Sequence, residues 1–240
     1  MSVEILSIPI LPLGMVNAFA LLAPRHTVLV DTGVEGSLPK VRAALASAGR
    51  AMADVDLVVL THAHTDHAGD AWALRQATGA RFLAHEAELP YLRGERPMPF
   101  CSTGWFGDLF WRTGAPLAPY APVEPDIVMR GDSELDLAPW GIDGAIVPTA
   151  GHTPGSLSLV LAGGDAIVGD LLASGMLLGG IARRRHARRP PYEEAPHQVA
   201  EALEALVDRG VERFFLGHGG PVDAPEVLRH VARLRALPAR

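Results

Sequence analysis

Apolar positions in the first half of the chain predict strands that alternate with helices. Short apolar or alternating runs predict strands, whereas apolar residues spaced three and four apart predict a helix. In Leu38–Ala48, for example, Val41, Ala44, Leu45 and Ala48 share one helical face. The other predicted elements here are the strands Ile5–Ile10, Val16–Leu22, Thr27–Val30, Asp56–Leu60 and Arg81–Ala84 and the helix Ala71–Thr78.

From Glu124 the pattern changes to short strands that follow one another closely, as in a β meander. A helix, a strand and a closing helix complete the chain, so each half is a group of strands followed by strand–helix units. Two sheets packed face to face with helices outside satisfy this order. The predicted elements are the strands Leu135–Leu137, Gly144–Val147, Ser156–Leu161, Asp165–Val168 and Arg213–Leu216 and the helices Glu193–Asp208 and Pro225–Leu237.

Composition narrows the class of protein. The 240 residues are 48% hydrophobic and 20% charged, enough for a sizeable core without disulfides. A formal net charge of −6 argues against a broad polyanion-binding surface. The single cysteine, Cys101, excludes an internal disulfide and is compatible with a reducing cytoplasm. We therefore expect a cytoplasmic protein with a small-molecule substrate and no nucleic-acid partner, and leave open a homodimer.

The apolar N-terminus does not have the features of a membrane segment. It lacks a basic n-region, carries Glu4 early and is interrupted by Pro9, Pro12 and Gly14. No other stretch offers about 18 uninterrupted apolar residues, so we expect no membrane partner.

Residues 96–123 fit neither half, because they combine many Pro and Gly residues with a large share of the aromatic ones. One interpretation is a satellite cluster packed on the core. The other is an insertion that forms an apolar lid or pocket wall, with Trp105, Phe106 and Trp111 as candidate substrate contacts. The aromatic residues of the segment are Phe100, Trp105, Phe106, Phe110, Trp111 and Tyr120.

Four side chains of the kinds that bind metals lie within six positions directly after the strand Asp56–Leu60. His62 and His64 are two apart, so their side chains point to the same side if the backbone stays extended. Asp66 and His67 follow where the chain turns towards the next helix. Imidazole and carboxylate groups suit zinc, manganese and iron.

Three more candidate ligands lie downstream, each at the end of a predicted strand and flanked by glycine. His152 follows Gly151, Asp170 follows Gly169, and His218 lies between Gly217 and Gly219. Glycine lets backbone segments approach closely. Together with the first cluster they make seven candidate ligands, enough for two metal ions.

The motifs His-x-His-x-Asp-His, Gly-His, Gly-Asp and Gly-His-Gly resemble those of the metallo-β-lactamase superfamily. The resemblance covers nearly the whole chain, from Asp31 to Gly219, and implies an α/β (α+β) fold, a four-layer αββα sandwich, over one domain of residues 1–240. The resemblance also implies that the metal site lies at one edge of the two sheets. By resemblance, the first metal is held by His62, His64 and His152 and the second by Asp66, His67 and His218, with Asp170 bridging them.

The resemblance implies a hydrolase that uses two divalent ions, with zinc expected first and manganese or iron as alternatives. A metal-bridging hydroxide would attack the carbonyl of an ester, thioester, lactone or amide. Asp66 would act as a catalytic residue that orients the hydroxide or passes a proton. Asp31 and Thr61 are candidates for fixing the histidine tautomers, with simple turn chemistry as the alternative.

The motifs also narrow the branch of the superfamily. Asp170 at the bridging position resembles glyoxalase II-like thioesterases and acyl-homoserine lactonases. The lactonases carry a tyrosine three residues later, where this chain has Ala173, so their mechanism does not transfer unchanged. The arginine-rich loop 183–189 is either a solvated basic loop or a clamp for an acidic substrate.

Two alternatives to the hydrolase stay open. Persulfide dioxygenases share these motifs but use one iron held by two histidines and an aspartate, which here would be His62, His152 and Asp170. A metal-binding scaffold without turnover is the other, and the complete set of expected ligands argues against it.

Overall fold

Residues 3–238 are described in a computed structural model, where the first half of the chain forms a six-stranded sheet. Strands β1 to β3 are antiparallel, and β3 to β6 run parallel. Side chains of β2 are buried on both faces, which explains its uninterrupted apolar sequence. The sheet has the order β1 (Glu4–Leu11), β2 (Val16–Leu22), β3 (Thr27–Val30), β4 (Val55–Val59), β5 (Arg81–His85) and β6 (Ile127–Met129).

The second half forms another six-stranded sheet. Its strands pair antiparallel except β10 and β13, which run parallel because α6 crosses between them. Its order is β14 (Val222–Asp223), β13 (Arg213–Phe215), β10 (Asp165–Ile167), β9 (Leu157–Leu161), β8 (Gly144–Pro148) and β7 (Leu135–Asp136).

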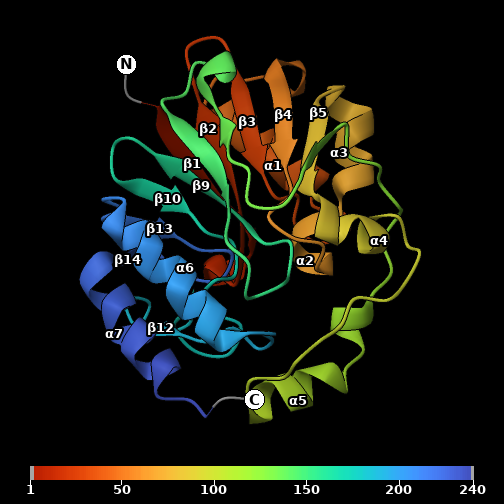
Figure 1. Ribbon diagram of the computed structural model, residues 1–240. Helices are drawn as coiled ribbons and strands as arrows, with labels where there is room; N and C mark the ends of the chain where they lie inside the picture. The colour runs from red at the N-terminus through yellow and green to blue at the C-terminus, as the bar shows by residue number, and fades with distance from the viewer. Residues whose placement is uncertain (1–2, 239–240) are drawn as a thin grey trace.

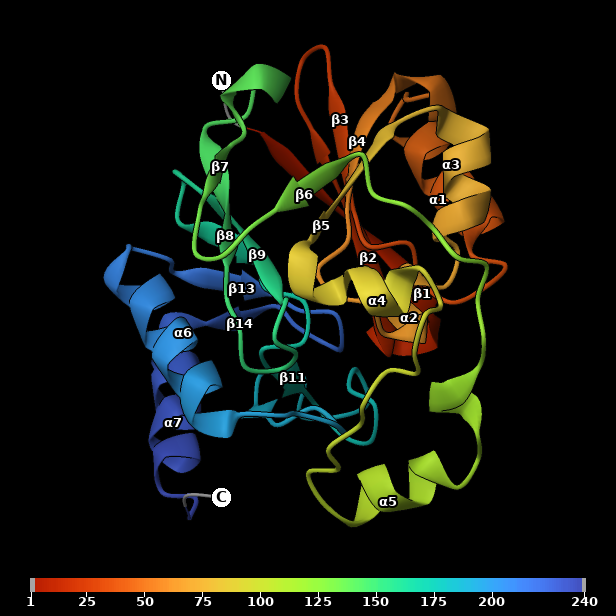
Figure 2. The same ribbon diagram turned by 45° about the vertical axis from the view of Figure 1, so that its right-hand side comes forward.

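The two sheets pack face to face, and helices cover their outer faces (Figures 1 and 2). Helices α1 (Leu38–Ser47) and α3 (Ala71–Thr78) pack on the first sheet, and α6 (Pro196–Asp208) and α7 (Ala224–Arg235) on the second. A separate apolar core, which includes Phe19, fills the space between the sheets. The predicted αββα architecture is therefore confirmed.

Short elements complete the chain. Helix α6 begins at Pro196, three residues later than predicted, because proline suits the first helical turn. The aromatic segment is not only loop, since it contains helix α5 (Figure 1). The short elements are α2 (Thr65–Ala68), α4 (Leu89–Leu92), α5 (Trp105–Trp111), β11 (Ala173–Ser174), β12 (Ala187–Arg188) and the 3-10 turns Pro12–Gly14, Met52–Asp54, Glu86–Glu88, Ala115–Leu117 and Ala138–Trp140. Within residues 3–238, no helix has the length and apolar character needed to cross a membrane.

Candidate metal centre

Strands of both sheets end at one edge of the sandwich, and the candidate ligands follow these ends. The histidine run begins just after β4 and continues into α2, where His67 is fully buried. His152 follows β8, Asp170 follows β10 and His218 follows β13. Residues up to 156 positions apart (from His62 to His218) thus meet at one edge of the sheets, where the resemblance implied a site.

Three histidines form a compact triangle of nitrogen atoms. The distance from His62 Nε2 to His64 Nδ1 is 3.0 Å, and His152 Nε2 lies 3.2 Å and 3.1 Å from these two atoms. Ligand nitrogens about 2.0–2.1 Å from a tetrahedral zinc ion lie about 3.3 Å apart. The triangle therefore has the size of one face of such a coordination shell.

A second group lies beside the triangle. His218 Nε2 is 3.3 Å from Asp66 Oδ2 and 3.0 Å from Asp170 Oδ2, and His67 Nε2 is 3.3 Å from Asp170 Oδ1. Asp170 Oδ2 is also 3.8 Å from His152 Nε2. Asp170 thus lies between the two groups, as a bridging carboxylate would.

Partners outside the cluster orient the rings. His67 Nδ1 donates to Asp31 Oδ2 at 2.8 Å, and His218 Nδ1 donates to the Met15 carbonyl at 2.5 Å. The Thr61 hydroxyl donates to Asp31 at 2.9 Å and therefore accepts from His62 Nδ1 at 3.0 Å. Because these acceptors hold the proton on Nδ1, each Nε2 presents a lone pair to the cluster. The contacts predicted for Asp31 and Thr61 are confirmed.

Unpaired atoms test whether the residues fit a cation. His67 Nε2 and Asp170 Oδ1 are buried without a hydrogen bond, although they are 3.3 Å apart, because they are not aligned for one. Buried polar atoms without partners are costly, and a shared cation satisfies them. The donor set of imidazole and carboxylate groups therefore fits one or two divalent ions.

Close approach of the second sheet requires glycine at position 217. A Cβ atom there would lie 2.3 Å from Asp170 Oδ1 and 2.5 Å from His67 Cε1. No side chain larger than hydrogen fits at that distance, so Gly217 permits the packing of the second group.

Charge divides the cluster into two parts. Burial, and then the neighbouring His152, lowers the pKa of His64 to about 3, and burial is the main reason that the pKa of His152 falls to about 4. Burial also acts to lower the pKa of His218, but Asp170 and Asp66 together outweigh it and raise the pKa to about 10. The triangle is thus a neutral donor set, whereas the second group contains the two carboxylates, whose charge favours a cation in place of the proton on His218.

Glu88 is a structurally important residue that sequence reasoning missed. Its fully buried carboxylate accepts from Ala63 N at 2.9 Å, Thr153 Oγ1 at 2.8 Å and Gly155 N at 2.9 Å. Ala63 lies between two candidate ligands and Thr153 follows a third. Glu88 therefore ties together the two loops that form the histidine triangle, and its position in a 3-10 turn offered no signal for this.

A cavity of about 220 Å³ opens over the cluster and has mostly apolar walls. Phe100 stacks on the His64 ring with 4.8 Å between centroids, and the Tyr192 hydroxyl donates to the Gly107 carbonyl at 3.1 Å. Apart from the candidate ligands, the walls consist of Leu11, Val16, Val34, Thr65, Phe100, Phe110, Ala115, Pro116, Leu178, Pro190, Pro191 and Tyr192.

The three predicted aromatic contacts do not line this cavity. Trp105 and Phe106 line a different cavity on the other side of α5, and Trp111 is exposed, reaching the site only through its contact with Phe100 at 5.4 Å. Phe100 and Phe110 line it instead, and Phe110 lies near the end of α5, whereas Trp105 and Phe106 lie at its start.

Other residues considered from the sequence lie away from the cluster. His85, at the end of β5, binds the Gly131 carbonyl through Nε2 at 3.0 Å, in keeping with a structural role. Ala173 is buried in β11. The arginine-rich loop has two parts that differ in exposure. Residues 183–185 are exposed, whereas Arg188 and Arg189 are partly buried beside α5.

Comparison with known proteins agrees with this geometry. The profile of the metallo-beta-lactamase superfamily matches residues 11–218, and the chain belongs to that superfamily. The probable metallo-hydrolase YflN of Bacillus subtilis is 25% identical over 208 residues, which cover 83% of this chain and 77% of that protein. The uncharacterized protein YobT of the same organism is 27% identical over 218 residues, which cover 88% of this chain and 85% of that protein.

Solved structures share the fold at low sequence identity. A metallo-beta-lactamase family protein from Thermus thermophilus is 22% identical with a TM-score of 0.67, covering 98% of this chain and 78% of that one. A metallo-beta-lactamase HARLDQ-motif mutant from Cronobacter sakazakii is 23% identical with a TM-score of 0.65, and the match covers 92% of this chain and 86% of that one.

Proposed function

We propose that the protein is a hydrolase that uses two divalent metal ions, zinc in the first instance, to cleave a carbonyl compound. The observation that carries this is the triangle of nitrogens 3.0–3.2 Å apart, beside a second group that shares Asp170 with it. Names of relatives as probable metallo-hydrolases support the same reaction class.

Each group of residues has a distinct task in this proposal. His62, His64 and His152 would hold one ion, and Asp66, His67 and His218 the other, with Asp170 shared. The ions would supply a water that ionises near neutral pH and a Lewis acid for the carbonyl oxygen.

Asp66 is the side chain best placed to handle a proton. Asp66 and Asp170 both line the cavity, but the side chain of Asp66 is 25% exposed whereas that of Asp170 is nearly fully buried. One carboxylate oxygen of Asp66 faces His218, and the other lies 4.0 Å from His67 Nε2. Asp66 could therefore orient the attacking water or carry its proton to the leaving group.

The cavity supports a compact, apolar substrate portion. Its volume is about 220 Å³, and Phe100, Phe110, Pro116 and Tyr192 give it apolar walls beside the cluster. An ester, thioester or lactone with a short aliphatic or aromatic acyl group fits these walls.

Metal content per chain, measured by elemental analysis of protein purified without chelators, tests the proposal first. We expect about two zinc or manganese ions and hydrolysis of aryl esters, thioesters or lactones. The His64→Ala variant should lose one ion and at least about a hundredfold in kcat/KM, because even partners of ligands are worth 10–100-fold.

His26→Ala is the matched control, since His26 is partly exposed and binds only Asp56, away from the cluster. If the protein instead contains a single iron and consumes oxygen, the proposed hydrolase is wrong and a persulfide-dioxygenase-like activity is favoured. Full activity of His64→Ala would contradict the assigned site.

A further inference from the structure

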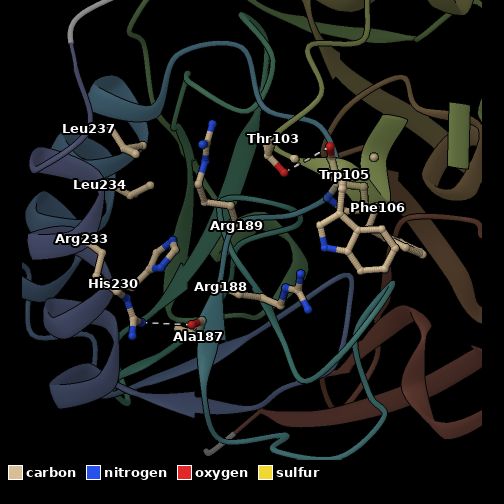
Figure 3. A pocket seen from close by; sticks show the side chains of 13 residues that line it. Thr103, Trp105, Phe106, Ala187, Arg188, Arg189, His230, Arg233, Leu234 and Leu237 are labelled. Carbon is tan, nitrogen blue, oxygen red and sulfur yellow. Dashed lines mark hydrogen bonds between the residues drawn. The ribbon is translucent and has the colours of Figure 1, made fainter. Parts of the chain in front are cut away.

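A second cavity, of about 480 Å³, lies on the other side of α5 from the metal centre. Its walls are α5, the segment that follows β12, and α7. Figure 3 shows the side chains of Arg188 and Arg189 between those of α7 and the indole of Trp105. The cavity shares only Pro191 with the walls of the cavity over the cluster.

His230 of α7 is a buried polar side chain without a partner in this cavity wall. The residue is 2% exposed, and neither ring nitrogen has a hydrogen-bond partner. Burial, then the neighbouring Arg233 and Arg189, lowers the pKa of His230 to about 4, so the ring is neutral at pH 7. A neutral imidazole retains one N–H that can donate to a ligand.

The arginines around His230 have N–H groups that donate no hydrogen bond within the protein. Arg189 Nε donates to Glu193 at 2.6 Å, but Arg189 Nη2 is buried without a hydrogen bond. Arg188 uses only Nη1, which donates to the Gly175 carbonyl at 3.1 Å. Guanidinium groups with free, preorganised donors select carboxylates.

Charge at the cavity is positive overall. Arg233 Nη2 contacts Glu226 Oε1 at 3.2 Å, and Arg229 neutralises the same carboxylate at 2.7 Å. Glu193 and Glu226 are the acidic partners of these arginines, so the guanidinium groups at this wall outnumber the carboxylates.

The opposite wall is apolar and aromatic. Trp105 is 72% exposed, and Phe106 packs edge-on against it with 5.9 Å between ring centroids. Leu234 of α7 and Leu237, which follows it, add apolar surface on the facing side of the cavity. An exposed tryptophan beside arginines offers a flat face to an apolar group whose charged end is held nearby.

We propose that this cavity is a binding site for a small organic carboxylate with an aromatic or aliphatic body. The carboxylate binds the guanidinium of Arg188, which points towards Trp105, while Arg189 and His230 add a second positive charge and an N–H to the same cavity wall, and the body packs on Trp105 and Phe106. The site is separate from the metal centre and goes beyond the proposed hydrolysis, because the ligand is held here without contact with the candidate metal ligands. The arginine-rich loop and the tryptophan, considered separately in the sequence, thus serve one site.

Isothermal titration of the metal-loaded protein with 4-phenylbutyrate tests this site. We expect one site per chain and at least about tenfold weaker binding of the uncharged 4-phenylbutyramide, since hydrogen bonds to a charged group are worth about 1.5–3 kcal/mol. Hydrogen–deuterium exchange should slow in residues 103–107 and 187–191 when the acid is bound.

Two variants that leave the buried core intact locate the site. Arg188→Met and Trp105→Ala should each weaken binding about tenfold. Arg185→Met and Trp72→Ala are matched controls, because both residues are exposed and outside the cavity lining. Circular dichroism checks that all four variants fold.

Three results would overturn the proposal. They are no binding at millimolar 4-phenylbutyrate, equal binding of the amide, and an unchanged Kd in both Arg188→Met and Trp105→Ala. The last result would place the acid at the metal centre, where a loss of binding in His64→Ala identifies it. None of these results tests the proposed hydrolase function, which is tested separately by metal content and turnover.

Discussion

Asp31 is not a candidate ligand, but its side chain orients two histidines of the cluster. It is held at φ 62°, a left-handed conformation that aspartate tolerates better than most residues. In this position one carboxylate oxygen accepts from both Thr61 Oγ1 and His67 Nδ1, and the other accepts from Thr61 N. One residue therefore sets the tautomer of a histidine in each half of the cluster.

Asp31→Asn should lower metal affinity, kcat/KM or both by about 10–100-fold. The amide keeps the size of the carboxylate but removes the charge that strengthens the bond to His67. Affinity is measured by competition with a chromophoric zinc chelator, and kcat/KM on the best ester found.

Asp56→Asn is the matched control, because Asp56 also accepts from a histidine, His26, at 3.0 Å but is exposed and far from the cluster. Equal behaviour of the two variants would show that Asp31 only closes a turn.

At the scale of elements, α5 decides which aromatic residues meet a substrate. Its sequence, Trp-Phe-Gly-Asp-Leu-Phe-Trp, has aromatic side chains all around the helix. Phe110, near the end of the helix, lines the cavity over the metal centre, whereas Trp105 and Phe106, at its start, line the second cavity. Phe106 and Phe110 stack with 5.9 Å between centroids, so the helix separates the two cavities by a layer of rings.

Phe110→Ala should raise KM for substrates with apolar acyl groups by about tenfold and leave kcat within about threefold, because a lost wall weakens uniform binding. Steady-state kinetics over a series of acyl groups measures this. Leu109→Ala is the control on the same helix, since Leu109 is 54% exposed and lines neither cavity. A matching rise in KM for Leu109→Ala would indicate that both substitutions disturb the whole of helix α5, and not the cavity wall that Phe110 forms.

Helix α7 makes stability sensitive to acid through His230. Its pKa of about 4 in the folded protein lies below the ordinary value of 6.5, so the unfolded chain binds the proton more tightly. The stability from the neutral ring is complete above pH 6.5 and is lost as the pH falls towards 4. At about 1.4 kcal/mol per pKa unit, the loss is on the order of 3 kcal/mol.

Urea unfolding of His230→Leu should therefore show a shallower loss of free energy between pH 6.5 and 4 than the wild type. The exposed His186, replaced by leucine as a control, should leave the wild-type slope unchanged. Parallel curves for wild type and His230→Leu would contradict the buried, neutral ring.

At the scale of the whole molecule, the candidate metal centre joins the two sheets. His62, His64 and His67 follow a strand of the first sheet, whereas His152, Asp170 and His218 follow strands of the second. Bound ions would therefore link the two halves of the sandwich, in addition to the apolar core between the sheets and the hydrogen bonds of Glu88.

Removal of the ions with a chelator should lower the melting temperature on the order of 10 °C. Free metal at about 1,000 times Kd stabilises by about 4 kcal/mol, and each kcal/mol shifts Tm by about 2–4 °C in a chain of this size. Scanning calorimetry before and after dialysis measures the shift, and zinc should restore it. His64→Ala should respond less to the chelator, and a full response there would argue that the ions bind elsewhere.

Local pattern and residue chemistry determined much of this protein. Apolar periodicity predicted most strands and helices, because side chains on a buried face must follow the period of their element. The seven candidate ligands were recognisable because four of them cluster within six positions after a strand and each of the other three lies beside glycine at a strand end. These signals are contained in a few consecutive residues, so one sequence suffices to find them.

Only the tertiary structure decided which side chains meet across the fold. Glu88 and Thr153 are 65 positions apart, and no local pattern marks their contact. Phe110 rather than Trp105 faces the metal centre because the placement of α5 against the segment 190–192 sets that orientation. His230 and Arg189 likewise become one cavity wall only when α7 packs beside β12. Such contacts depend on the packing of distant segments, which the free energy of the whole fold determines.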